Sequence, residues 1–268
     1  MYTAVIDCMD LKQISESGQC FRMKHISGDT YSVTALGSYT EITQKGREFT
    51  FSCSEDEFHR IWFPYFDLTT DYNAVAGLVD PADSYLTAAV RYGCGIRILN
   101  QDLWEMIITF LISQNNNITR ITRSVEALCT QLGEPGVTEY GVRYHSFPTP
   151  SAIAGAGMDG LGTLGLGYRD KYILKTAEHV MDGSLDLSLL PVLPYEEAHS
   201  YLMVQYGIGK KVADCVCLFG LHHIDAFPID THIKKILEAH YPDGFPYDRY
   251  AGVLGIIQQY LFYYDLKA

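Results

Sequence analysis

A glycine-rich turn followed by two lysines is the first feature of this chain that could do chemistry. Residues 201–215 read YLMVQYGIGKKVADC, so an apolar helical stretch passes through Gly207-Ile208-Gly209 into a second helix. The glycines allow a tight turn, and the free amides at the start of the second helix favour an anion. The pattern predicts a helix-hairpin-helix, which holds a DNA backbone without reading its bases. The alternative is an ordinary corner between two helices that ends on a glycine.

Lys211 lies in the first turn of the second helix, where its amine could be a nucleophile. The positive end of the helix and the charge of Lys210 both disfavour an ammonium there, so the amine is neutral part of the time. A neutral lysine amine forms a Schiff base with an aldehyde-level carbon. The alternative is a pair of solvated lysines that contact phosphates.

Asp230 follows in the segment Phe227-Pro-Ile-Asp-Thr-His232. Pro228 forces an extended entry, so Asp230 stands where the next helix begins and is expected to cap it. Its carboxylate could also stabilise positive charge on a sugar as a glycosidic bond breaks. The two roles can coexist.

Length and composition limit the class of protein. The chain has 268 residues, of which 47% are hydrophobic, enough for a real core and too many for a disordered chain. The longest apolar run, Met106–Ile112, is too short to span a bilayer, and the acid-bearing N-terminus is not an export signal. The seven scattered cysteines lack a CxxC pair and are expected to be free thiols. We expect a cytoplasmic protein with no membrane partner, associated with the nucleoid if the source is prokaryotic.

The net charge of −12 counts against binding to nucleic acid over the whole surface. Basic residues nevertheless gather locally, in Asn115–Arg123, in Arg169, Lys171 and Lys175, and in Lys210, Lys211, Lys234 and Lys235. Acids gather elsewhere, as in Glu55-Asp56-Glu57. The sequence therefore predicts one basic face for DNA, with weak non-specific affinity and strong salt dependence.

The elements that must position these residues differ between two parts of the chain. Residues 1–78 alternate apolar and polar side chains between glycines, which predicts antiparallel strands, with a short helix that starts at Ser54 and ends at Pro64. Residues 79–268 have helical periodicity, with 148–168 expected to be loop with at most short helices. The predicted fold class is α+β, with an N-terminal antiparallel β-sheet domain with helices followed by an all-α helix-hairpin-helix domain.

The expected helices can be placed on the sequence. The first begins at the capping residue Asn100, and the second runs from Ile118 to Leu132 after the polar break Gln114–Asn117. The others are expected at Tyr172–Val180, Pro194–Tyr206, Lys210–Leu221, Thr231–His240 and Asp248–Leu266.

Five segments in the same order resemble the helix-hairpin-helix glycosylase superfamily, and specifically its 8-oxoguanine DNA glycosylase branch. They are Ser17-Gly18-Gln19-Cys20-Phe21-Arg22, Gln114–Ile121, Leu164–Arg169, Gly207–Cys215 and Pro228–His232. The resemblance implies a bifunctional enzyme of base excision repair. It releases 8-oxoguanine from double-stranded DNA, opposite cytosine, through a lysine Schiff base and then cleaves the strand by β-elimination.

The resemblance also implies roles for individual residues. Lys211 is the nucleophile and Asp230 the catalytic carboxylate. The base would be bound by the Gly18 carbonyl, by Cys215 and Phe262 on its two faces, and by Gln258 at its Watson–Crick edge. DNA would be contacted by Asn115, Arg120 and Arg169 at the orphaned cytosine, by the wedge Tyr168, by His232 at a phosphate, and by the hairpin glycines Gly207 and Gly209. Taken singly, Phe262 and Tyr168 could instead be core aromatics, Gln258 a surface amide and Cys215 a small buried hydrophobe.

Other readings remain open. A glycosylase for alkylated bases is typically monofunctional and lacks the hairpin lysine, and a non-catalytic DNA-binding module would not need Lys211 together with Asp230. His222 and His223 lack the spacing of paired metal ligands, which disfavours a metal nuclease. No cysteine follows Cys217, so no iron–sulfur cluster is expected. We expect no cofactor, although a structural metal ion could bind hairpin carbonyls beside DNA, and we expect a monomer.

Overall fold

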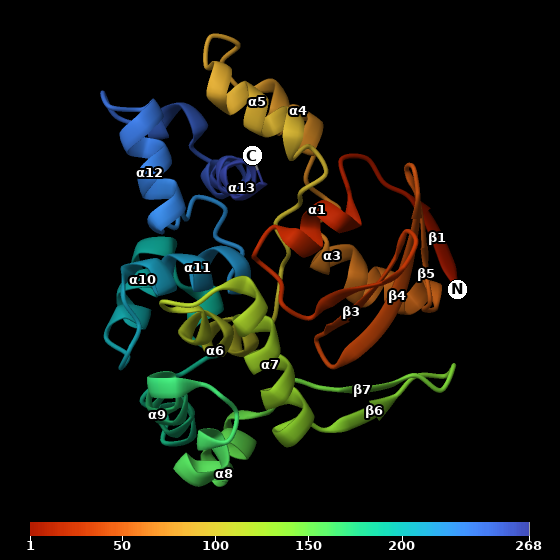
Figure 1. The fold of residues 1–268 in the computed structure, drawn as a ribbon, viewed down its shortest axis with the longest axis vertical. Coiled ribbons are helices and arrows are strands. Elements are labelled where there is room, and N and C mark those ends of the chain that lie inside the picture. The colour runs from red at the N-terminus through yellow and green to blue at the C-terminus, as the bar shows by residue number, and fades with distance from the viewer. Residues whose placement is uncertain (268) are drawn as a thin grey trace. The chain divides into compact units, whose positions relative to one another are not determined.

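The computed structural model describes residues 1–267, which form two compact units (Figure 1). The first unit contains Met1–Ser32, Thr40–Asn100 and the chain from His222 onward, and the second contains Val33–Tyr39 and Gln101–Leu221. Each unit is thus assembled from separated stretches of chain. The predicted domain boundary between residues 78 and 79 instead divides the sequence at a single point, and it stays a prediction.

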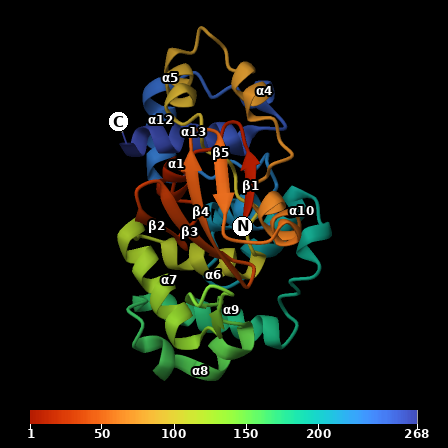
Figure 2. The ribbon, with the colours of Figure 1, turned by 90° about the vertical axis from the view of Figure 1, so that its right-hand side faces the viewer.

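A five-stranded antiparallel sheet of order β1-β5-β4-β3-β2 is the β part of the fold (Figure 2). Its strands are β1 (Tyr2–Val5), β2 (Met23–Ser27), β3 (Thr30–Ala35), β4 (Ser38–Lys45) and β5 (Glu48–Phe51). Ile42 pairs with Phe51 across β4 and β5, and both side chains are fully buried. The predicted alternation therefore places one apolar face of the sheet in the core.

Short helices surround the sheet in the first unit, and longer ones form its helical part. They are α1 (Leu11–Glu16), α2 (Glu55–Glu57), η1 (Phe58–Trp62), α3 (Phe63–Tyr65), α4 (Tyr72–Gly77), α5 (Ser84–Tyr92), α12 (Thr231–His240), η4 (Tyr247–Tyr250) and α13 (Leu254–Lys267). α13 packs against α5 and α12. Ser54 caps α2 as predicted, but the expectation that Pro64 ends the helix was wrong. Pro64 sits in the first turn of α3, where its missing N–H is not needed.

The second unit is helical apart from one small hairpin. Its elements are α6 (Leu103–Ser113), α7 (Ile118–Leu132), β6 (Pro135–Val137), β7 (Arg143–His145), α8 (Pro150–Gly162), η2 (Gly167–Arg169), α9 (Asp170–Met181), η3 (Leu190–Val192), α10 (Tyr195–Met203) and α11 (Lys210–Gly220). Every residue of α6 from Trp104 to Ile112 is buried, and α6 packs extensively on α11. α6 is therefore the central helix of this unit.

One local expectation in the second unit was wrong. Asp102, not Asn100, caps α6, because its carboxylate accepts from the amide of Glu105. The segment 148–168, expected to be loop with at most short helices, contains α8, which starts at the cap Thr149 and is divided into two short helical pieces by non-helical backbone at Gly157. The α+β fold class itself is confirmed. In the described part of the chain, no helix is both long and apolar enough to cross a membrane.

Candidate active site

The predicted hairpin is present between α10 and α11 in the second unit. Gly207 has a φ of +85°, and a Cβ at this position would lie 2.5 Å from the ring of Tyr172. Both observations require glycine. Gly209 is the N-cap of α11 and supplies no side-chain cap, so side chains leave the first-turn amides of α11 uncovered. Such amides can receive an anion such as a phosphate.

Lys211 is half-buried at the start of α11 and reaches the end of α6. Its Nζ lies 3.4 Å from Ser113 Oγ, to which it donates, and 5.2 Å from the centroid of the Phe110 ring. Cys215 stands one helical turn after Lys211 and is 3% exposed. The amine and the thiol therefore occupy the same side of α11, as their predicted roles require.

The turn between α6 and α7 brings two predicted DNA contacts together. Asn115 has a positive φ and donates from Nδ2 to the hydroxyl of Tyr168 over 3.2 Å. Tyr168 is 48% exposed, and Asn115 and Arg120 are also exposed. Asn117 caps α7 through the amide of Arg120. Asn115, Tyr168 and Arg120 are thus accessible to a DNA ligand.

Arg169 is placed differently from the other predicted DNA contacts. Only 8% of it is exposed, and its guanidinium donates to the carbonyls of Gln114, Asn115 and Leu166. It also lies 4.7 Å from the ring centroid of Tyr168. Arg169 therefore holds the turn that presents Asn115, through four hydrogen bonds to three backbone carbonyls.

A buried polar cluster on the two hairpin helices was missed by sequence reasoning. Asp214 is 2% exposed, accepts from the hydroxyl of Tyr195 at 2.7 Å and lies 3.2 Å from His199 Nε2. Burial raises the pKa of Asp214, an effect that the Tyr195 bond and the nearby His199 partly offset. The only sequence signal was the polar Asp214 inside an otherwise apolar run.

In the first unit, Gly18 stands in a loop that is fixed from both sides. Its φ is +74°, a conformation that favours glycine. The preceding Ser17 accepts at its carbonyl from Gln259 Nε2 over 2.6 Å. The following Gln19 donates to the carbonyl of Arg97 over 2.9 Å and accepts from the amide of Leu99 over 2.8 Å. The backbone at Gly18, including the carbonyl with a predicted role, is therefore preorganised.

Gln258 on α13 has an unmet hydrogen bond. The side chain is 4% exposed, and its Nε2 donates to the carbonyl of Pro228 over 3.1 Å. Its Oε1 is buried without a partner among the described residues. A buried acceptor without a donor is costly and indicates a ligand that supplies one. Phe262 follows one turn later on the same face of α13 and is half-buried.

Asp230 caps α12, as predicted from its position. One carboxylate oxygen accepts from the amides of His232 at 3.0 Å and Ile233 at 2.9 Å. The ring of His232 pairs with Asp265 through Nδ1 at 2.6 Å and meets the ring of Phe262 edge-on. Asp265 was missed by sequence reasoning. It lies three residues after Phe262 on α13, which was the only available signal.

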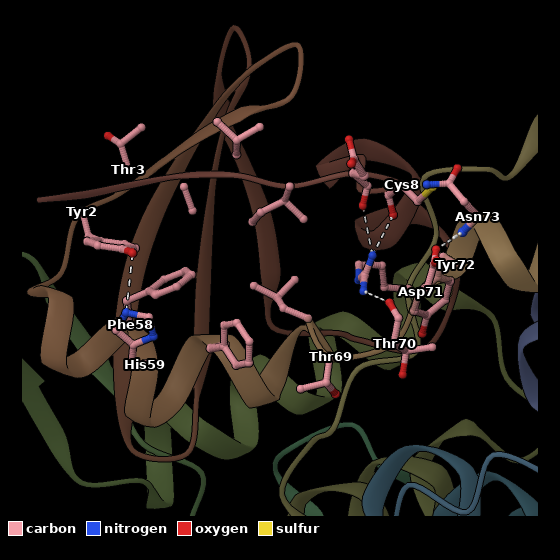
Figure 3. A pocket seen from close by; sticks show the side chains of 17 residues that line it. Tyr2, Thr3, Cys8, Phe58, His59, Thr69, Thr70, Asp71, Tyr72 and Asn73 are labelled. Carbon is pink, nitrogen blue, oxygen red and sulfur yellow. Dashed lines mark hydrogen bonds between the residues drawn. The ribbon is translucent and has the colours of Figure 1, made fainter.

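A pocket of about 670 Å³ in the first unit contains none of the predicted site residues (Figure 3). It lies between β1, η1 and residues 68–73, with Tyr2 and His59 at one end and Asp71 and Asn73 at the other. The guanidinium of Arg97 in its wall is engaged by five backbone carbonyls. This arginine is therefore committed to structure and not available to a ligand.

Among the described residues, no group of three or more His, Cys, Asp and Glu side chains could hold a metal ion. The predicted structural cation would rest on hairpin carbonyls, which are hard oxygen ligands suited to Ca²⁺ or Mg²⁺. One of these carbonyls, that of Gly207, already accepts from Gln114 Nε2 over 3.1 Å.

The chain matches two known families over adjoining segments. Residues 4–107 match the 8-oxoguanine DNA glycosylase N-terminal domain, and residues 108–244 match the HhH-GPD superfamily of base excision DNA repair proteins. The chain is also 41% identical over 158 residues to the N-glycosylase/DNA lyase of Saccharomyces cerevisiae. That alignment covers 55% of this chain and 42% of the yeast protein, so the match spans less than half of this curated relative.

Two solved structures resemble nearly the whole chain. MBOgg1, solved with a low-affinity DNA ligand, is 35% identical with a TM-score of 0.91, and the match covers 98% of this chain and 93% of MBOgg1. The 8-oxoguanine glycosylase/lyase of Clostridium acetobutylicum, in complex with duplex DNA containing cytosine opposite 8-oxoguanine, is 32% identical with a TM-score of 0.90. That match covers 96% of this chain and 92% of the clostridial one.

Proposed function

The chain belongs to the 8-oxoguanine DNA glycosylase family of the HhH-GPD superfamily, and from this we propose that it is a bifunctional glycosylase and lyase that removes 8-oxoguanine from duplex DNA. The lesion is flipped out of the stack, its glycosidic bond is broken, and the strand is then cleaved on the 3′ side. The base opposite is cytosine, as in the duplex bound by the clostridial relative.

Base recognition is carried by the unpartnered Oε1 of Gln258. 8-Oxoguanine offers N–H donors at its Watson–Crick edge, which match this buried acceptor. The damaged base also has a hydrogen on N7, which undamaged guanine lacks. The preorganised carbonyl of Gly18 accepts that hydrogen and would face the lone pair of N7 in guanine, which penalises the normal base. Cys215 and Phe262 cover the two faces of the base.

Catalysis begins with the neutral amine of Lys211. Its lone pair attacks C1′ of the sugar as the bond from C1′ to the base breaks, and the base leaves with a proton. The carboxylate of Asp230 stabilises the positive charge that develops on the sugar. Ring opening gives a Schiff base between Nζ and C1′. Loss of a proton from C2′ then expels the 3′ phosphate, and water releases the lysine.

We propose that residues of each unit contact DNA. The uncovered amides after Gly209 bind a phosphate in the helix-hairpin-helix manner, and His232 binds another. Tyr168 fills the space left by the flipped base, while Asn115, Arg120 and Arg169 recognise the orphaned cytosine. The reaction needs no cofactor, because the lysine supplies the nucleophile. We propose that the enzyme acts as a monomer on chromosomal DNA.

Borohydride trapping on a duplex with 8-oxoguanine opposite cytosine tests this function. Borohydride reduces the Schiff base to a stable covalent adduct, so the wild-type enzyme is expected to become linked to the lesion-bearing strand. Lys211→Gln is expected to give no adduct, no base release and no strand cleavage, while DNA binding survives. Lys45→Gln is the matched control, since it removes one exposed lysine charge at the end of β4, away in the sequence from every predicted site residue, and should leave trapping intact.

Each outcome separates the candidate activities. Base release without an adduct would mean a monofunctional glycosylase and a misassigned lysine. Equal adduct on undamaged duplex would remove 8-oxoguanine as the substrate. Neither adduct nor base release would leave a DNA-binding protein without this activity.

A further inference from the structure

The C-terminal turn of α6 carries side chains to which sequence reasoning gave no role, and the Lys211 amine points into them. Nζ lies 3.4 Å from Ser113 Oγ and 5.2 Å from the centroid of the Phe110 ring. All three residues belong to the second unit. Building on the proposed function, we propose that Ser113 is a positioning residue that orients the Lys211 amine for attack on the sugar.

The direction of the hydrogen bond follows from the other contact of Ser113. Its hydroxyl donates to the carbonyl of Phe110 over 2.8 Å, so the oxygen presents its lone pairs to Nζ. Lys211 must then be the donor. In the neutral amine, one N–H bond is fixed toward Ser113, and the nucleophilic lone pair must point away from it. Ser113 therefore limits the directions from which the lysine can attack.

Phe110 supplies a rigid wall for the same amine. It is 2% exposed and stacks on Phe219 at a centroid distance of 5.5 Å and an interplanar angle of 16°. A lysine side chain has many rotamers, and holding it in few of them before the reaction raises the rate. The ring and the serine together hold Nζ in one place.

Gln114 fixes the distance between this turn and the hairpin. Its Nε2 donates to the Gly207 carbonyl over 3.1 Å, and its own carbonyl accepts from Arg169 Nε over 2.8 Å. The C-cap of α6 and the hairpin turn before α11 are therefore tied by a hydrogen bond from the residue next to Ser113. Ser113 acts through the lysine, not by touching DNA.

The test uses a duplex that carries an abasic site opposite cytosine, which presents the aldehyde without base recognition. The rate of borohydride trapping in a single turnover, the Kd for the duplex and the thermal midpoint are measured separately for each protein. Ser113→Ala removes the acceptor, and Ser113→Thr keeps a hydroxyl. Ser15→Ala is the matched control, because Ser15 makes the same kind of bond, to the Lys12 carbonyl at 2.9 Å, on α1.

Ser113→Ala is expected to trap roughly tenfold more slowly with a nearly unchanged Kd, because it loses the hydrogen bond that orients Nζ. Ser113→Thr is expected to recover most of the rate, and Ser15→Ala to match the wild type. Trapping by Ser113→Ala at the wild-type rate would overturn the inference. So would a loss of rate in which Kd rises, the thermal midpoint falls and Ser113→Thr gives no recovery. Absence of a wild-type adduct would instead refute the lyase activity and, with it, the role of Ser113.

Discussion

At the scale of single residues, we propose a chemical role for several side chains that also have a structural one, and the two can be separated most clearly at Asp230. Its carboxylate caps α12 through the amides of His232 and Ile233. Capping needs only an acceptor oxygen, whereas stabilising a sugar cation needs a negative charge. A substitution that keeps the oxygen and removes the charge can therefore isolate the catalytic role.

Asp230→Asn is expected to unfold at nearly the wild-type temperature, because asparagine is an equally good N-cap. Its single-turnover excision rate is expected to fall by roughly a hundredfold, in the range for losing a charge-stabilising group. Asp230→Ala should lose the cap as well, which typically lowers stability by ~1 kcal/mol. Thermal unfolding and rapid-quench kinetics give the two readouts. A near-native rate for Asp230→Asn would reduce this residue to a helix cap.

At the scale of elements, the hairpin between α10 and α11 depends on one of its two glycines for its shape. Gly207→Ala combines a left-handed backbone with a Cβ 2.5 Å from the Tyr172 ring, and is expected to destabilise the protein by about 1–3 kcal/mol. Gly209 has a φ of −97°, and no atom lies within 4 Å of an added Cβ. Gly209→Ala should leave stability within about 0.5 kcal/mol of wild type. Urea unfolding of the two variants distinguishes them, and equal losses would contradict this account.

The buried cluster that joins α10 to α11 gives a pH-dependent prediction. Burial, the largest influence, raises the pKa of Asp214 above its ordinary value of 3.8. A raised pKa means that the folded state binds the proton of Asp214 more tightly than the unfolded state does. The stability gained from this proton binding is fully present below pH 3.8 and is lost as pH rises through the folded-state pKa. Asp214→Asn still accepts the Tyr195 bond but never ionises.

Asp214→Asn should therefore gain stability relative to wild type as pH rises from 3.8 through the folded-state pKa of Asp214. Urea denaturation of both proteins across this range measures the difference. The opposite trend would mean that a protonated His199 pairs with the carboxylate and makes the charged form favourable in the fold.

Elements were more predictable than the contacts between them. The cap Asp230 and the apolar spacing after it gave α12 its bounds, because both signals are local. In 148–168 only short helices were expected, and α8 is indeed broken at Gly157, because glycine weakens a helix; its start at Thr149 and Pro150 was not predicted. The bonds of Arg169 to Gln114 and Asn115 join residues more than 50 positions apart. No local pattern reports such a contact, so an arginine in a plausible DNA motif was read only as a DNA contact.

At the scale of the whole molecule, a chain of net charge −12 must bind a polyanion through a minority of its surface. Phosphate contacts release counterions, so each one adds about 0.9 to the slope of log K against log salt. If the local basic groups make several such contacts, affinity for duplex DNA should fall by about tenfold or more between 50 and 200 mM salt. We expect the acidic remainder of the chain to keep affinity for undamaged DNA weak, which would allow release and further search.

Fluorescence anisotropy with a lesion-bearing duplex at several salt concentrations tests this division of charge. Lys210→Gln, beside the hairpin amides, should lower the slope by about 1, because it removes one phosphate contact. Lys45→Gln is the matched control, since Lys45 is an exposed lysine at the end of β4, away from every predicted DNA contact in the sequence. Equal slopes for the two variants would mean that the hairpin lysine makes no phosphate contact. A slope near zero for wild type would place recognition in the base pocket alone, without a basic DNA face.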